Sequence, residues 1–319
     1  MKKTLLILAA LGLSGLAAAL LTADSKTPAT RSFQAIYVGT IASMPAGAKH
    51  ADVWIPLPSD GPYQTITDLS VAAPAAYTIG KDSAGNRVAH IALDGPALGK
   101  EIEIRAAYKV TRREAVAPSK EPERFDDELK ENRLVKLTPR VKELAKELSA
   151  GKTDPVAKAH AFYDYLVDNG TYDKTTPGWG RGDSERFCDV KKGNCTDFHS
   201  AFMALARAEK IPVRFVIGFP VKAEKEGTVP GYHCWAFFHA SAGWIPVDAS
   251  DAAKLKDPAK KAYLFGNLDA DRFDVSSGRD LTLAPPQKDG PVNFLISPYV
   301  EVDGKAFAET RMRLEYKDL

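Results

Sequence analysis

Three residues whose side chains could do chemistry together follow one another along the chain as Cys195, His233 and Asp248. Cys195 follows Gly193 and Asn194 at the start of an amphipathic stretch, and the other two residues lie in short apolar segments typical of strands. A thiol, an imidazole and a carboxylate are the parts of a cysteine nucleophile with an oriented base. The pattern predicts attack by sulfur on a carbonyl carbon, without a cofactor.

The segment after Asn194 predicts a helix that runs to about Lys210 and carries the thiol in its first turn. Asn194 is a favourable N-cap, and Asp197 complements the exposed amides and the helix macrodipole. Thiolate pKa values at helix N-termini fall to roughly 3.5–7.5. The same amides could donate to an oxyanion that forms beside the sulfur. Asn194 is therefore also a candidate oxyanion or cleft residue.

A predicted hairpin places the imidazole and the carboxylate on one face of a sheet. If its loop covers residues 239–242, His233 and Asp248 pair directly, and directly opposed residues hold their Cβ atoms about 4.5–5.5 Å apart. A slip of one residue would put them on opposite faces. The same alternation predicts that Cys234 points away from this face.

Each residue also has a purely structural interpretation. Taken alone, Cys195 could be a buried thiol, His233 a core histidine and Asp248 a turn residue, whereas the three together favour catalysis. His199 lies four residues after Cys195 on the same helix face, and we expect it to pack or hydrogen-bond near the site. A metal centre of Cys195, His199 and His233 is the weaker alternative, because no ligand pair has zinc-type spacing.

Two further features leave alternatives open. Trp179, in a Pro-Gly-Trp-Gly segment, either lines the substrate cleft, aims its indole N–H at the oxyanion, or covers the core. Three cysteines leave an odd thiol after any single disulfide. Cys188 and Cys234 are either bridged or free, and both alternatives remain at this point.

The N-terminus has the layout of a secretory signal. Lys2 and Lys3 precede an uncharged apolar run over residues 5–21, and small residues follow. We predict removal of residues 1–23 and a periplasmic or secreted protein, with membrane association only if this segment stays as an uncleaved anchor. Without the two lysines, the 41 acidic side chains are matched by an equal number of basic ones, which disfavours nucleic acid as a partner.

The rest of the chain divides by pattern. Residues 31–116 alternate with period two, best seen from Ile102 to Val110, which predicts an all-β, immunoglobulin-like sandwich. Residues 117–131 are charged, contain two prolines and are predicted to be a linker. Residues 132–275 begin with residue patterns typical of helix starts and stops and are the predicted catalytic domain. Residues 276–319 are predicted to be a strand-rich extension.

The motifs resemble those of the bacterial transglutaminase-like superfamily. The resemblance covers about residues 137–250 and rests on three segments in the family's order: Gly193–Asp197 with its helix, Tyr232–Trp235 and Gly243–Asp248. The region before them looks like the sandwich that often precedes this core in exported bacterial members.

This resemblance implies a papain-like α+β core, with helices packed on an antiparallel sheet. It implies that Cys195 is the nucleophile, His233 the general base and acid, and Asp248 the residue that orients the imidazole. No calcium-ligand constellation is evident in the sequence, which disfavours metal-regulated cross-linking.

The implied function is that of an exported thiol enzyme acting on peptide or isopeptide amide bonds through a cysteine thioester, by hydrolysis or acyl transfer. The expected partner is a protein or peptide substrate, or a cell-envelope component. A catalytically inert envelope-binding or scaffold protein on the same fold is the alternative. The sequence does not indicate an oligomeric state.

Overall fold

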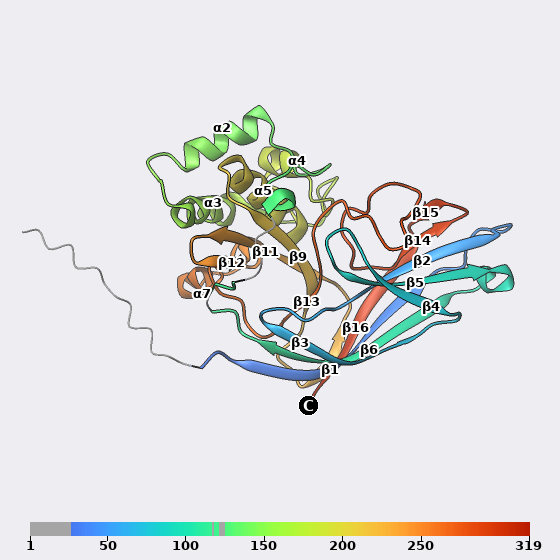
Figure 1. Cartoon of the computed structure of the whole chain (residues 1–319). Helices are drawn as coiled ribbons and strands as arrows, with labels where there is room; N and C mark the ends of the chain where they lie inside the picture. The colour runs from blue at the N-terminus through green and yellow to red at the C-terminus, as the bar shows by residue number, and fades with distance from the viewer. Residues whose placement is uncertain (1–26, 117, 121–124) are drawn as a thin grey trace, which may run out of the picture.

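The computed structural model describes residues 27–116, 118–120 and 125–319 (Figure 1). The predicted signal segment, residues 1–23, therefore lies outside the described residues, as does part of the predicted linker. None of the helices within the described ranges combines the length and the hydropathy needed to cross a bilayer.

Two antiparallel five-stranded sheets form the all-β part of the molecule. The first has the order β10-β16-β1-β6-β3 and the second the order β15-β14-β2-β5-β4. The strands of the first sheet are β1 (Thr30–Ile41), β3 (Gln64–Ala72), β6 (Ile102–Arg113), β10 (Glu226–Val229) and β16 (Thr310–Asp318). Those of the second are β2 (His50–Leu57), β4 (Tyr77–Lys81), β5 (Arg87–Asp94), β14 (Tyr299–Val302) and β15 (Lys305–Phe307), and the 3-10 helix η1 (Gly95–Gly99) follows β5.

The alternation predicted for β6 is present in the structure. Residues Ile102, Ile104, Ala106, Tyr108 and Val110 are buried, and the side chains between them are more exposed. One face of this strand therefore packs on the core, as the period-two pattern predicted.

The C-terminal segment, predicted to be an extension, supplies β14, β15 and β16 to these two sheets. β16 pairs with β1, from Phe33 opposite Asp318 to Ile41 opposite Thr310, and β14 pairs with β2. N-terminal and C-terminal strands thus build the two five-stranded sheets together, and β10 from the middle of the chain is added at the edge of the first sheet.

The second part of the molecule is a four-stranded antiparallel sheet with helices packed against it. Its order is β12-β11-β9-β13, with β9 (Val213–Pro220), β11 (His233–Ala240), β12 (Gly243–Val247) and β13 (Arg272–Ser277). The helices are α1 (Phe125–Glu128), α2 (Pro139–Leu148), α3 (Pro155–Asn169), α4 (Ser184–Val190), α5 (Cys195–Ala208), α6 (Ala249–Ala252) and α7 (Pro258–Tyr263). The short strands β7 (Thr171–Tyr172) and β8 (Lys192–Gly193) pair in parallel just before α5.

In Figure 1, helices α2 to α5 lie together with this sheet, and the two five-stranded sheets lie to the other side. The predicted α+β fold with a β-rich N-terminal region is therefore confirmed. One hydrophobic cluster runs through both parts. Phe33 of β1 packs edge-on against Phe273 of β13, and Tyr63 stacks on Phe237 of β11.

The helix starts follow from local chemistry. Thr138 caps α2 and Asp154 caps α3, with a proline at the first helical position in each case. Their side-chain oxygens accept from backbone amides three residues on, which satisfies donors that a helix N-terminus leaves free.

Candidate active site

Cys195 is the first residue of α5, at the end of the helix where the macrodipole favours an anion. The side-chain oxygen of Asn194 accepts from the amide of Thr196 at 2.9 Å, and the carboxylate of Asp197 accepts from the amide of Asn194 at 2.9 Å. This reciprocal capping fixes the backbone around the thiol. Cys195 itself is only 1% exposed.

Asp197 has a larger part in the site than the sequence indicated. Besides the amide of Asn194, its carboxylate accepts from the amides of Gly180 at 2.7 Å and Gly182 at 2.9 Å. These bonds attach the loop that carries Trp179, which is 39% exposed, to the start of α5. The roles predicted for Trp179 and Asn194, in the cleft or at the oxyanion, remain predictions.

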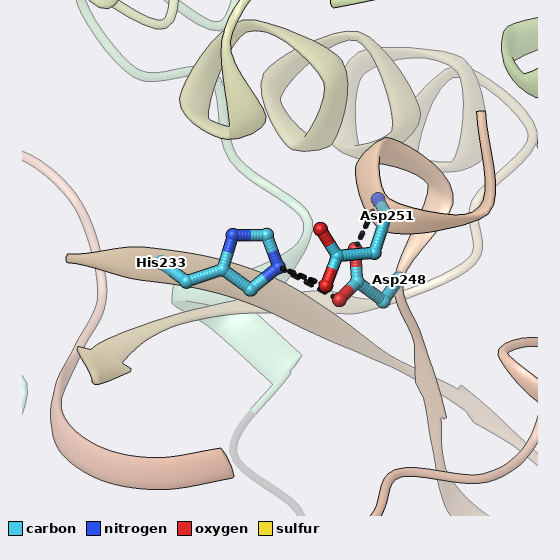
Figure 2. Close-up of side chains that lie close together, drawn as sticks. All are labelled: His233, Asp248 and Asp251. Carbon is cyan, nitrogen blue, oxygen red and sulfur yellow. Dashed lines mark hydrogen bonds and ion pairs between the residues drawn. The ribbon is translucent and has the colours of Figure 1, made fainter. Parts of the chain in front are cut away.

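The structure brings His233 and Asp248 together. His233 is the first residue of β11, and Asp248 follows β12 directly and caps α6. The Nε2 atom of His233 lies 2.8 Å from Oδ2 of Asp248, and Figure 2 shows the imidazole pointing toward the carboxylate. A further side-chain hydrogen bond joins His233 to the thiol of Cys195. The imidazole therefore lies between the thiol and the carboxylate.

The pairing register of the hairpin differs from the predicted one by two residues. Ala236 lies opposite Val247, and the turn consists of residues 241–242 alone. Gly243, with φ at +119°, allows the chain to turn this tightly, and a Cβ there would lie 2.4 Å from the carbonyl oxygen of Ser119. Because side chains alternate with period two, a shift of two residues leaves His233 and Asp248 on the same face.

Burial and charge act on the three side chains in opposite directions. Burial alone would raise the pKa of Cys195, but hydrogen bonds from Cys234 and His233 and nearby positive charge hold it well below its usual value. Burial opposes the charged form of His233, yet Asp248 and Asp251 raise its pKa to about 10. The pKa of Asp248 is likewise held well below its usual range by His233 and Arg272, against the effect of burial. The lowered pKa of Cys195 and the raised pKa of His233 together favour a thiolate beside an imidazolium.

The prediction that Cys234 points away from the site is wrong. Its Sγ lies 3.6 Å from Nδ1 of His199, and it hydrogen-bonds to the thiol of Cys195. The reason is that α5 packs across β11 on the face that carries Cys234, whereas His233 reaches the thiol from the very start of the strand. Cys188, Cys195 and Cys234 are all buried free thiols.

His199 lies on α5 beside the site. Its Nδ1 lies 2.8 Å from the carbonyl oxygen of Cys195, and its Nε2 lies 3.7 Å from Oδ1 of Asp248. Burial lowers its pKa, which favours a neutral ring. A neutral ring can donate from Nδ1 to the Cys195 carbonyl.

Two residues that sequence reasoning missed complete the surroundings of Asp248. Arg272, at the start of β13, donates to Oδ2 of Asp248 from Nε at 3.1 Å and from Nη2 at 2.8 Å. Its Nη2 also donates to Oδ2 of Asp251 at 2.8 Å, and Nη1 pairs with Asp269. Asp251 could have been suspected from its place three residues after Asp248, but nothing local marks Arg272.

The metal centre considered as the weaker alternative from the sequence consisted of Cys195, His199 and His233. Among the described residues, the donor atoms that converge within 4.8 Å belong to His233, Asp248 and Asp251. The guanidinium of Arg272 already bridges both carboxylates, so this arrangement is neutralised by a side chain of the protein itself.

Two tyrosines flank the thiol and were not singled out from the sequence. Tyr232, next to His233, accepts at its hydroxyl from the side-chain amide of Asn194 at 3.3 Å. Burial raises the pKa of Tyr172, and the neighbouring charge of Cys195 adds to this effect. The ammonium of Lys254 lies 4.4 Å from the centre of the Tyr172 ring and also pairs with Asp251.

Comparison with known proteins agrees with this geometry. The family model of the transglutaminase-like superfamily matches residues 142–249. This stretch includes α5, β9, β11, β12 and Asp248, and therefore spans all three converging side chains.

An uncharacterized protein of Haemophilus influenzae is 29% identical over 307 aligned positions, which cover 82% of this chain and 83% of that protein. A solved structure from Cytophaga hutchinsonii, described as a candidate cysteine protease, superposes with a TM-score of 0.63 at 15% identity and covers 91% of each chain. The periplasmic domain of TgpA from Pseudomonas aeruginosa has a TM-score of 0.37 at 17% identity, covering 69% of this chain and 87% of that one. At such identities the Cytophaga structure establishes the likeness of the fold.

The matched segment holds the cysteine at a helix start, the histidine at a strand start and the aspartate at the end of the next strand. The chain thus carries a transglutaminase-like core, as its sequence motifs predicted.

Proposed function

We propose that this protein is an exported thiol enzyme that acts on peptide or isopeptide amide bonds through a thioester on Cys195. The single observation that supports this most strongly is the buried line of thiol, imidazole and carboxylate, with the thiol at a helix N-terminus. In the proposal Cys195 is the nucleophile, His233 the general acid and base, and Asp248 the residue that orients the ring.

The thiolate attacks the carbonyl carbon of the amide, and the negative charge passes to the carbonyl oxygen. In the first turn of α5 the amide of Thr196 is already bonded to the side chain of Asn194, and that of Asp197 to the carbonyl of Asn194. This favours the amide of Cys195 as the first-turn donor to the oxyanion.

Collapse of this adduct breaks the carbon–nitrogen bond, and the imidazolium of His233 gives its proton to the leaving amine. The neutral imidazole then takes a proton from the acceptor that resolves the thioester. Water as acceptor gives hydrolysis, and an amine gives acyl transfer. Asp248 stays ionised throughout, because Arg272 and His233 stabilise its negative charge.

The export part of the proposal rests on the N-terminal sequence, with two lysines before an apolar run and small residues at a predicted cleavage point. A periplasmic or extracellular enzyme would meet protein or peptide substrates, or a component of the cell envelope.

The proposal is tested by labelling the purified protein with iodoacetamide and with an electrophilic peptide near pH 6. Free thiols with ordinary pKa values react slowly there because little thiolate is present. We expect fast labelling of Cys195 and none in Cys195→Ala, with Cys188→Ala as the matched control that keeps the wild-type rate. Slow labelling, or equal labelling in Cys195→Ala, would favour an inert scaffold on this fold.

A further inference from the structure

The imidazole of His233 faces two carboxylates. Its Nε2 atom lies 2.8 Å from Oδ2 of Asp248 and 3.4 Å from Oδ2 of Asp251 (Figure 2). A single N–H can point well at one acceptor only, so Asp248 takes the hydrogen bond. Asp251 acts through its charge, and an opposite charge at this distance favours the protonated ring.

One guanidinium nitrogen connects the two carboxylates. Nη2 of Arg272 lies 2.8 Å from Oδ2 of Asp248 and 2.8 Å from Oδ2 of Asp251, the same two oxygens that face the imidazole. Two carboxylates this close would otherwise repel each other. The positive charge of Arg272 offsets this repulsion beside His233.

The two acids are held differently. Asp248 is fully buried, and its Oδ1 accepts from the hydroxyl of Ser250 at 3.2 Å and from the amide of Asp251 at 3.0 Å. The side chain of Asp251 is 26% exposed and also pairs with Lys254. Asp248 thus has a fixed position, whereas Asp251 lies at the edge of the site.

We infer that Asp251 and Arg272 are positioning residues of the proposed reaction, with Asp251 holding His233 as imidazolium and Arg272 limiting that effect. The balance matters because a general acid must keep its proton in the resting state and still release it to the leaving amine. Beside Asp248 alone, the imidazole of His233 would have a lower proton affinity. Beside two uncompensated carboxylates, its proton affinity would be too high for ready transfer to the leaving amine. This inference rests on the proposed function.

The charges that face His233 come from three elements. Cys195 and His199 lie on α5, Asp248 and Asp251 at α6, and Arg272 on β13. Of these, Asp251 can be neutralised with the least disturbance. An asparagine there keeps the shape, keeps an oxygen for Arg272, and leaves the backbone amide that donates to Asp248 unchanged.

The test is a histidine titration by NMR on the full chain labelled with ¹³Cε1-histidine. The chain has six histidines, and the His233 signal is assigned by its loss in His233→Gln. We expect Asp251→Asn to lower the titration midpoint of His233 by about 1 pH unit or more. Arg272→Gln should move it upward. If that variant fails to fold, Asp251→Asn decides the question, because its partly exposed site tolerates the change.

Asp269→Asn is the matched control. Asp269 pairs with Arg272, as Asp251 does, but it is not among the groups with the largest effects on the pKa of His233. Its replacement should leave the midpoint in place. An unchanged midpoint in Asp251→Asn, or the same shift in Asp269→Asn, would overturn the inference.

The titration does not require turnover, so it separates this inference from the proposed function. With an active enzyme, the alkaline limb of kcat/KM should move in the same direction as the NMR midpoint. A shifted midpoint in a protein without turnover would refute the enzyme while leaving the charge arrangement standing. Turnover with an unshifted midpoint would refute the role of Asp251.

Discussion

Replacing Cys195 with serine should change how the stability of the folded protein depends on pH. The pKa of Cys195 is held well below the usual 9.0 in the folded state. Its ionisation therefore contributes stability that is fully present above pH 9.0 and is lost as the pH falls through the folded value. The pKa of His233 is raised from 6.5 to about 10, so its contribution is fully present below pH 6.5 and is lost as the pH rises through about 10.

The two effects have opposite signs between pH 6.5 and 9.0. In the part of this window that lies above the lowered pKa of Cys195, the folded pair holds one proton, on His233, and the unfolded pair also holds one, on Cys195. The pair therefore makes no net contribution to the slope of wild-type stability in this window. Serine does not ionise, so Cys195→Ser leaves only the falling contribution of His233. Asp248 and Asp251 raise the pKa of His233 more than Cys195 does, so this contribution persists.

The size of this effect follows from linkage: a difference of one bound proton between the two states changes the free energy of unfolding by about 1.4 kcal/mol per pH unit. From about pH 6.5 to about pH 8.5, the free energy of unfolding of Cys195→Ser should fall by about 2.7 kcal/mol relative to wild type. Urea denaturation followed by circular dichroism and by tryptophan fluorescence measures this quantity where the two transitions coincide.

Cys188→Ser is the control for this experiment. Burial raises the pKa of Cys188 from 9.0 to about 11, so this thiol is mostly neutral in both states up to about pH 8.5 and contributes little slope there. Its difference from wild type should not depend on pH. If Cys195→Ser also showed a constant difference from wild type, Cys195 would be protonated in the folded protein, and the ion pair would be refuted.

Two further substitutions test the contacts around the helix start. Cys234→Ala removes a donor to the Cys195 sulfur, so the pH midpoint for alkylation of Cys195 should rise by about 1 unit. Cys234→Ser keeps a donor and is the control. Equal midpoints in the two variants would contradict this prediction. Asp197→Ala leaves three backbone amides, those of Gly180, Gly182 and Asn194, without their acceptor, and two of these hydrogen bonds are buried. Urea denaturation should show a loss of about 3 kcal/mol in the free energy of unfolding. A loss below about 1 kcal/mol would indicate that the loop is held by other contacts.

The parts of the site that the sequence predicted are those with local signatures. Asn194 and Asp197 around Cys195 are a capping pattern readable within a few residues. His233 and Asp248 lie at the ends of two adjacent strands, and their shared face depends only on the parity of the register. The error of two residues in the predicted turn therefore did not separate them.

The parts that the sequence did not predict depend on contacts between distant segments. Arg272 reaches Asp248 because β13 pairs with β9, and no local pattern specifies that pairing. The same holds for β16, which pairs with β1 from the other end of the chain. The orientation of Cys234 depends on how α5 lies across β11, which is a matter of packing rather than of strand alternation.

Mass mapping of the acyl-enzyme tests directly whether Cys195 is the nucleophile. The protein is incubated with an amide-bonded peptide library, quenched in acid and digested, and the modified residue is identified. We expect an acyl group on Cys195 that hydroxylamine removes, as expected for a thioester, and no adduct in Cys195→Ala. Turnover that persists in Cys195→Ala, or an acyl group carried by another residue, would contradict it.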